Sequence, residues 1–162
     1  MAEDTKIQWT HHTFNPWVGC SKVSDGCKHC YAATLVNARP ALILGPGVPR
    51  AEGGQRLPLW GDAAPRRVTS AENWRQPLRW NRAAAKAGER RRVFCASLAD
   101  VFDDYGGIVT GDFARFTNGT GQTVPTMADL HDVRAHLWPL IEETRNLDHL
   151  LLTKRPENVL RM

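Results

Sequence analysis

The residues best suited to chemistry are three cysteines near the amino terminus. Cys20, Cys27 and Cys30 follow the spacing C-x6-C-x2-C. Two intervening residues allow the sulfur atoms of Cys27 and Cys30 to turn toward one metal, and the loop after Cys20 is rich in Ser, Asp and Gly, which turn easily. Thiolates are ligands for zinc and for iron–sulfur clusters. The spacing therefore predicts a metal site built from these three cysteines.

The number of cysteines separates the possible metals. A structural zinc takes four protein ligands, so a zinc site would also need a histidine, for which His11, His12 and His29 are the nearby candidates. A [4Fe–4S] cluster held by three thiolates keeps one iron without a protein ligand, and that iron can bind a small molecule. Radical S-adenosylmethionine (SAM) enzymes use this arrangement to cleave SAM to an adenosyl radical. We expect a [4Fe–4S] cluster with SAM, and zinc or metal-free thiols are the alternatives.

Three longer blocks of sequence are spread from end to end of the chain. They are WTHHTFNPWVGCSKVSDGCKHCYA, RRVFCASLADVFDD and HLLLTKRPENV, with the short QPLRW between the first two. Together they resemble the three-Cys-motif phage proteins, a family of unknown function that is similar to radical-SAM enzymes. The resemblance implies a partial or full (β/α) barrel. Its members usually continue beyond the third block, so we expect this chain to be C-terminally truncated. The common radical-SAM spacing is C-x3-C-x2-C, and the first gap here is longer.

The elements expected around these blocks alternate between strands and helices. Strands are expected over 7–14, 91–98 and 149–154, and helices over 31–39, 70–74, 77–88 and 127–145, with another from Pro156. The order β-α-β-α-β-α favours parallel strands joined by right-handed crossovers. The sequence thus predicts one α/β domain over residues 1–162. It is an incomplete (β/α) barrel of about three parallel units, with irregular insertions at 45–70 and 103–125, the second containing a hairpin.

Candidate cofactor-binding residues follow the second and third strands. In parallel α/β folds, ligands bind at the carboxyl ends of the strands, where Ser97, Asp100, Thr153, Lys154 and Arg155 are expected beside the cysteines. Ser97 and Asp100 would hydrogen-bond the amino group or ribose of SAM, whereas Lys154 and Arg155 would pair with its carboxylate. The alternative is that Ser97 and Asp100 cap the turn after their strand and that Lys154 is solvated.

The composition is that of a globular protein with a mildly basic balance. The 162 residues are 42% hydrophobic and 23% charged, with a formal net charge of +4. Arginines cluster between residues 66 and 92, where Glu72 and Glu89 are the only acids and Trp74 and Trp80 are interleaved. This pattern is typical of a nucleic-acid surface or of a solvated helix face. Cys95, in the middle of an apolar strand, is expected to be a core residue.

No stretch has the pattern of a signal peptide or of a membrane span, so a cytoplasmic location is expected. The expected partners are an electron donor and an unidentified substrate, for which a nucleic acid or nucleotide is the candidate. The edge of the strand over 149–154 favours self-association. The predicted function is that of a radical-SAM-like iron–sulfur protein that cleaves SAM to modify its substrate. The alternatives are a zinc-stabilised nucleic-acid-binding module without catalysis and an inactive truncated fragment.

Overall fold

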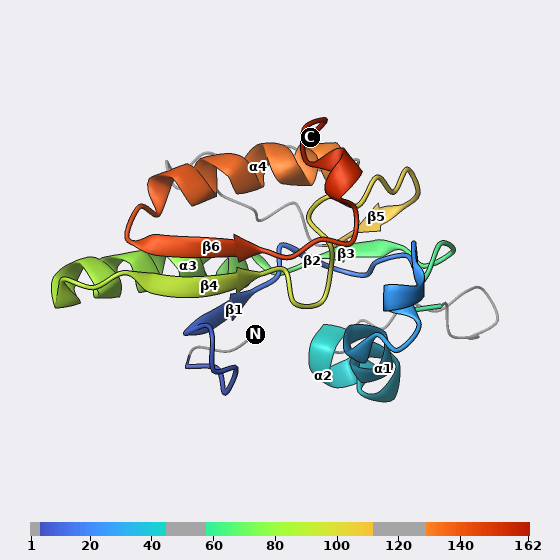
Figure 1. Ribbon diagram of the computed structural model, residues 1–162, viewed down its shortest axis with the longest axis horizontal. Helices are drawn as coiled ribbons and strands as arrows, with labels where there is room; N and C mark the ends of the chain where they lie inside the picture. The colour runs from blue at the N-terminus through green and yellow to red at the C-terminus, as the bar shows by residue number, and fades with distance from the viewer. Residues whose placement is uncertain (1–3, 45–57, 112–128) are drawn as a thin grey trace.

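A computed structural model describes residues 4–44, 58–111 and 129–162 (Figure 1). Its elements are β1 (His12–Phe14), β2 (Trp17–Val18), the 3-10 turn η1 (Asp25–Cys27), α1 (Tyr31–Ala38), α2 (Pro40–Leu44), β3 (Arg66–Val68), α3 (Ala71–Ala87), β4 (Arg91–Cys95), β5 (Val109–Thr110), α4 (Leu130–Glu143), β6 (Leu147–Leu151) and η3 (Pro156–Asn158). Helix α1 ends before Pro40, as expected, and the proline then begins α2, because its fixed φ suits the first turn of a helix.

The main sheet is parallel and has the strand order β1-β4-β6. Val93, in the central strand β4, pairs with His12 of β1 and with His149 of β6. A mixed α/β fold with three parallel strands is therefore confirmed. The described strands form an open sheet, so they do not confirm the predicted barrel. Strand β6 lies at an edge of this sheet, and its pairing with a second copy of the chain stays a prediction.

The strands begin and end differently from the sequence-based prediction. β1 starts at His12 because a turn, closed by Thr10 N donating to the Ile7 carbonyl at 3.2 Å, precedes it. β6 covers Leu147–Leu151 and ends before Thr153. Its last pair is Leu151 with Cys95, the final residue of β4, which is also shorter than the strand expected over 91–98. Beyond this pair the Asp100 carboxylate accepts from the Thr153 hydroxyl at 2.8 Å.

One continuous helix, α3, replaces the two helices expected on either side of Pro77. Ser70 caps its first turn and Gly88, at φ 67°, ends it. Trp74 and Trp80 lie on the same buried face before and after the proline. Burial of this face offsets the backbone hydrogen bond that the proline removes. None of the helices in the described ranges has the length and apolar character needed to cross a membrane.

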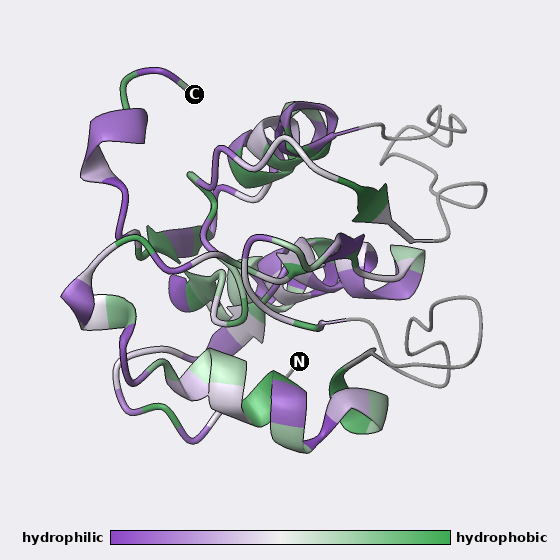
Figure 2. Cartoon of the chain, turned by 90° about the vertical axis from the view of Figure 1, so that its right-hand side faces the viewer, coloured by the Kyte–Doolittle hydropathy of each residue, from purple (hydrophilic) through white to green (hydrophobic). Residues whose placement is uncertain are grey.

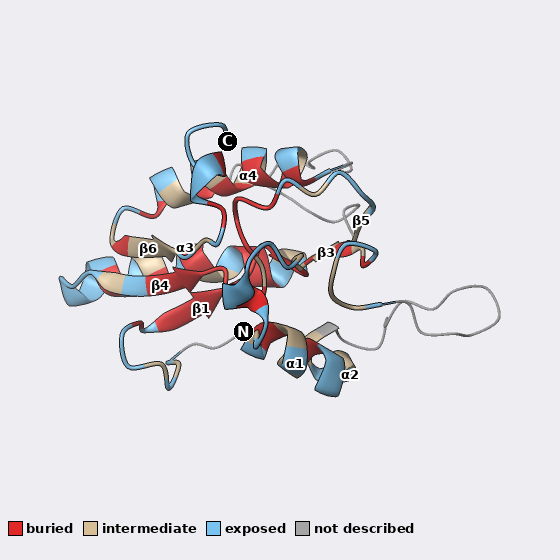
Figure 3. Cartoon of the chain, turned by 45° about the vertical axis from the view of Figure 1, so that its right-hand side comes forward, coloured by how far each residue is buried: buried red, intermediate tan, exposed pale blue. Residues whose placement is uncertain are grey.

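The core lies between the parallel sheet and α3, which contacts all three strands. Trp80 stacks on His12 with ring centroids 4.4 Å apart, and Trp74 meets Phe14 edge-on at 5.6 Å. Cys95 is fully buried among these residues, which confirms its predicted core role. Helix α4 packs beside α3, and its hydrophobic residues face the rest of the molecule (Figure 2). Figure 3 shows β1 and β4 as largely buried strands.

A second, smaller sheet has the order β2-β3-β5 and was not predicted. Its strand β3 lies within the segment 45–70 that was expected to be irregular, and residues 45–57 of that segment lie outside the described residues. β5 pairs in parallel with β3. β5 falls within the hairpin predicted in the segment 103–125, and the part of that segment from residue 112 on lies outside the described residues. Strands of two or three residues are too short to show the alternation by which strands are recognised.

Protonation of His149 should weaken the fold in mild acid. Burial lowers the pKa of this histidine from 6.5 to about 4, and Asp148 opposes the shift. Its Nε2 lies 2.8 Å from the Thr144 hydroxyl. Between pH 6.5 and 4 the unfolded chain binds a proton that the folded chain does not. The resulting stabilisation is complete above about pH 6.5 and is lost as the pH falls toward 4, by up to about 3 kcal/mol.

Urea titrations at pH 7 and pH 4.5 test this expectation by comparing the wild type with His149→Gln. Other groups titrate over the same range, so the informative quantity is the difference between the two proteins. The wild type should lose more unfolding free energy than the variant between the two pH values. Equal losses in both proteins would show that His149 does not contribute to the acid sensitivity.

Candidate metal centre

The three cysteines are held by three different pieces of local structure. Gly19 forms a bridge with Ala99, and its amide donates to the Leu98 carbonyl at 3.0 Å. These contacts place Cys20 beside the segment that follows β4. Cys27 closes the 3-10 turn η1, and Cys30 is the N-cap residue of α1. All three are free thiols.

The cysteines line one pocket of about 300 Å³ at the carboxyl ends of β4 and β6. The pocket is bounded by Cys20, Ser21, Lys22, Gly26, Cys27, His29, Cys30, Tyr31, Ala32, Trp60, Phe94, Ala96, Ser97, Ala99, Asp100, Leu152, Thr153 and Lys154. Four of the five residues predicted to bind a cofactor thus lie around the same cavity as the three predicted metal ligands. Arg155 does not line the pocket, and its buried side chain contacts Cys20 and Ser21 instead.

Hydrogen bonds and a nearby charge favour the thiolate form of Cys27. Backbone hydrogen bonds from Val23 and then Ser24 lower the pKa of this thiol, against the effect of burial, and Lys154 adds a smaller contribution. The Lys154 ammonium lies against the loop, because its Nζ is 3.5 Å from the position that a Cβ on Gly26 would take. A thiolate is the form of cysteine that binds metals.

Cys20 is in a different electrostatic environment. Burial raises the pKa of its thiol, and a hydrogen bond from Arg155 opposes that effect. Arg155 Nη1 lies 3.5 Å from Cys20 Sγ. The guanidinium therefore stands where it would stabilise a thiolate or a metal-bound sulfur.

Asp100 is already occupied by contacts within the protein. Its side chain is buried, and Oδ1 accepts from the Thr153 hydroxyl at 2.8 Å and from the Phe102 amide at 3.0 Å. Oδ2 accepts from the Lys154 amide at 2.9 Å and from Arg155 Nη1 at 3.3 Å. The carboxylate thus caps the turn after β4 and ties it to the end of β6, which is the structural alternative given above for this residue.

Ser97 is likewise engaged with its neighbours. Its hydroxyl accepts from Asn15 Nδ2 at 3.0 Å, and its carbonyl accepts from the Tyr31 hydroxyl at 2.7 Å. Asn15 Oδ1 also accepts from the Leu98 amide at 2.6 Å. Sequence reasoning gave Asn15 no role in the site, although its position inside the first sequence block was a signal of one.

A buried ion network behind the pocket was also missed. Asp103 accepts from Arg66 Nε at 2.8 Å and from Arg155 Nη2 at 3.1 Å, and all three side chains are at most 2% exposed. Burial raises the pKa of the Asp103 carboxyl, and the two arginines oppose it. Arg66 also lies over the Tyr105 ring, 3.8 Å from its centroid. Asp103 falls within the second sequence block, whereas nothing local to Arg66 marks it as buried.

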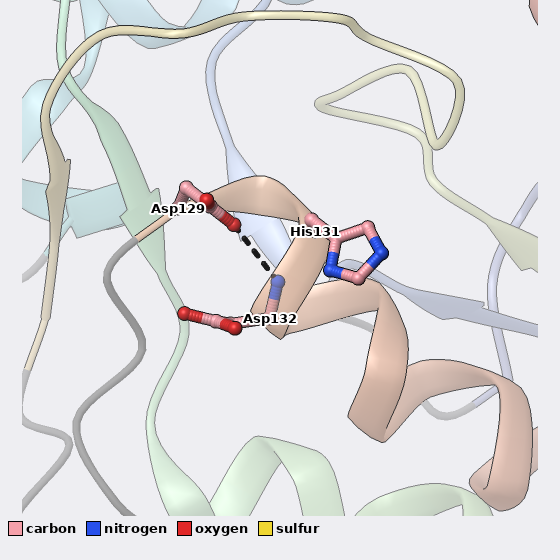
Figure 4. A group of neighbouring side chains, drawn as sticks. All are labelled: Asp129, His131 and Asp132. Carbon is pink, nitrogen blue, oxygen red and sulfur yellow. Dashed lines mark hydrogen bonds between the residues drawn. The ribbon is translucent and has the colours of Figure 1, made fainter.

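A separate group of possible metal ligands lies at the start of α4 (Figure 4). The ligand atoms of Asp129, His131 and Asp132 all lie within 4.8 Å of one another. Asp129 caps the helix, since its Oδ1 accepts from the Asp132 amide at 3.0 Å. Acidic residues at a helix N-terminus stabilise the helix dipole, which accounts for this group without a metal.

A comparison with known protein families finds a match. Neither a curated protein nor a solved structure matches the chain. A family described as a protein of unknown function (DUF5131) matches residues 4–116, which include the three cysteines, β1 to β5 and the turn after β4. The chain therefore belongs to this family of proteins of unknown function, DUF5131.

Proposed function

We propose that the protein is a radical-SAM-like iron–sulfur protein that binds a [4Fe–4S] cluster through Cys20, Cys27 and Cys30 and cleaves SAM to modify a substrate. The observation that carries the proposal is the shared pocket. Three free thiols from one short segment line a cavity of about 300 Å³ at the carboxyl ends of parallel strands. This volume lies at the lower end of the range for small-molecule sites.

Three thiolates are the donor set of a [4Fe–4S] cluster, because each thiolate binds a different iron and one iron stays open. A structural zinc needs a fourth protein ligand. His29, which lines the same pocket, is the candidate for that ligand. Backbone donors to Cys27 and the Arg155 guanidinium at Cys20 supply the hydrogen bonds that cluster sulfurs accept.

The remaining pocket residues would bind and orient a ligand beside the cysteines. When bound, the cluster supplies one-electron chemistry and one open coordination position. Lys154 is exposed at the rim and is the residue that would pair with a ligand carboxylate. Phe94, Leu152 and Trp60 provide apolar walls that suit an adenine ring and a thioether. Asp100 and Arg155 would act indirectly, by holding the ends of the strands together.

The alternative, a zinc-stabilised nucleic-acid-binding module, would use the basic surface of α3. Part of that surface is neutralised within the helix, since Glu72 lies 2.6 Å from Arg79 and 3.7 Å from Arg75. The exposed surface is thus less basic than the arginine count indicates. This alternative predicts zinc rather than iron in the purified protein.

Metal analysis after anaerobic reconstitution tests the proposal. We expect about four irons and four sulfides per chain, with visible absorption that bleaches on reduction. Cys27→Ala should abolish binding because it removes one of three thiolates. Cys95→Ala is the matched control and should retain the metal, since Cys95 is a core residue whose pKa burial raises to about 12. One zinc per chain without iron would exclude the cluster.

A further inference from the structure

We propose that Arg155 is the positioning residue of Cys20: it holds the Cys20–Ser21 segment in place and sets one positive charge beside the sulfur that would bind the metal. The inference rests on the proposed iron–sulfur function and deepens it. Sequence reasoning placed Arg155 on the ligand carboxylate, whereas the structure points its guanidinium at the cysteine segment.

Arg155 reaches Cys20 from the opposite end of the chain. It follows β6, and its side chain is 2% exposed. Nη1 donates to Cys20 Sγ at 3.5 Å, and Nη2 donates to the Ser21 carbonyl at 3.1 Å. One planar guanidinium thus contacts both the sulfur and the next backbone carbonyl, which fixes the direction in which Cys20 points.

Two buried carboxylates hold the guanidinium itself. Asp100 Oδ2 lies 3.3 Å from Nη1, and Asp103 Oδ1 lies 3.1 Å from Nη2. Asp103 also binds Arg66, whose Nη2 donates to the Ser21 hydroxyl at 2.6 Å. Ser21 is therefore held by two arginines that share one carboxylate. Such a network has few alternative arrangements, because any rotation would leave a buried charge unpaired.

Cys20 is the ligand that local structure supports least. Cys27 closes η1, where its amide donates to the Ser24 carbonyl at 2.9 Å, and Cys30 is the N-cap of α1, where its carbonyl accepts from the Thr34 amide at 3.2 Å. Cys20 is separated from them by six residues, of which 22–26 are exposed. A long, exposed gap cannot fix the distance between its ends. Backbone contacts hold the Cys20 main chain, since the Gly61 amide donates to the Cys20 carbonyl at 3.0 Å. Arg155, after β6, and Arg66 of β3 add the contacts that hold the sulfur and Ser21. These contacts account for how a C-x6-C-x2-C spacing can present three ligands together.

The charge of Arg155 has a second consequence. Reduction adds negative charge to a cluster, so a fixed positive charge and an N–H donor at a ligand sulfur both make reduction easier. Arg155 supplies both to Cys20. Removing its charge should therefore shift the midpoint potential of the cluster to a more negative value.

Two variants of the full chain separate these effects. Arg155→Gln removes the charge, and we expect a more negative midpoint potential in a spectroelectrochemical titration. Arg155→Lys keeps a cation between Asp100 and Asp103, so the fold should be retained and the potential should shift less than in Arg155→Gln. Its single nitrogen lacks the planar fork by which the guanidinium contacts sulfur and carbonyl from two nitrogens. Both variants should therefore show severalfold faster amide hydrogen exchange over residues 19–22 in the metal-free protein.

Arg161→Gln is the matched control, because Arg161 is an exposed arginine of the same segment that contacts Asn158. It should change neither the potential nor the exchange. An unchanged potential in folded Arg155→Gln would overturn the inference, as would unchanged exchange in Arg155→Lys. If Arg155→Gln does not fold, the lysine variant decides alone. A wild type that binds no iron would refute the proposed function, yet the exchange measurements on metal-free protein would still test the positioning.

Discussion

Replacing Asp103 with alanine should lower the free energy of unfolding by about 3–5 kcal/mol, because it leaves the two buried guanidinium groups of Arg66 and Arg155 without their shared carboxylate. Domains of this size are stable by only about 5–15 kcal/mol. The loss is therefore large enough to populate the unfolded state at ordinary temperatures. It should appear as a lower urea midpoint with an unchanged slope.

Asp104→Ala is the control for this prediction. Asp104 is next in sequence and its oxygen lies 3.8 Å from Arg155 Nε, but its side chain is 63% exposed. Water screens such a pair, so the variant should lose less than about 1 kcal/mol. Asp103→Asn keeps the shape without the charge and should fall between the two. A similar small loss in Asp103→Ala and Asp104→Ala would show that the buried network does not hold the fold together.

The parallel sheet was predictable because its strands carry short apolar runs between helical patterns. RRVFC and LDHLL both form strands, and the alternation with helices indicates parallel pairing. β3 was not predictable, since its sequence is RRV and its fully buried Arg66 has the composition of a surface residue. Arg66 is buried because Asp103, distant in sequence, neutralises it, and no local pattern records such a partner.

The candidate site was predictable only in its location. The rule that ligands bind at the carboxyl ends of parallel strands predicted that the cysteines, Ser97 and Lys154 lie close together. In the structure they line one pocket. The roles of individual side chains depend on the direction in which each points. Asp100 and Arg155 point into the protein and pair with each other, which sequence position alone does not reveal.

Asp100→Ala and Lys154→Ala should therefore change different properties of the protein, although both residues line the same pocket. Asp100→Ala should destabilise the protein by about 3–5 kcal/mol, since it leaves the buried Arg155 with one carboxylate fewer and frees the Thr153 hydroxyl and the Lys154 amide. Lys154→Ala should leave the urea midpoint unchanged, because the Lys154 side chain is exposed. Its effect should fall on the affinity for SAM.

Calorimetric titration of SAM into the reconstituted protein measures this second effect. A hydrogen bond between charged groups contributes about 1.5–3 kcal/mol, so Lys154→Ala should weaken SAM binding by roughly ten to a hundredfold while the iron content stays the same. Lys154→Arg should restore most of the affinity, and Lys86→Ala, at an exposed lysine near the end of α3, should have no effect. If Lys154→Ala binds SAM as the wild type does, the rim lysine does not contact the ligand. If Asp100→Ala folds normally and loses SAM instead, the carboxylate belongs to the binding site after all, and the contacts it makes with Thr153 and Arg155 must give way when the ligand binds.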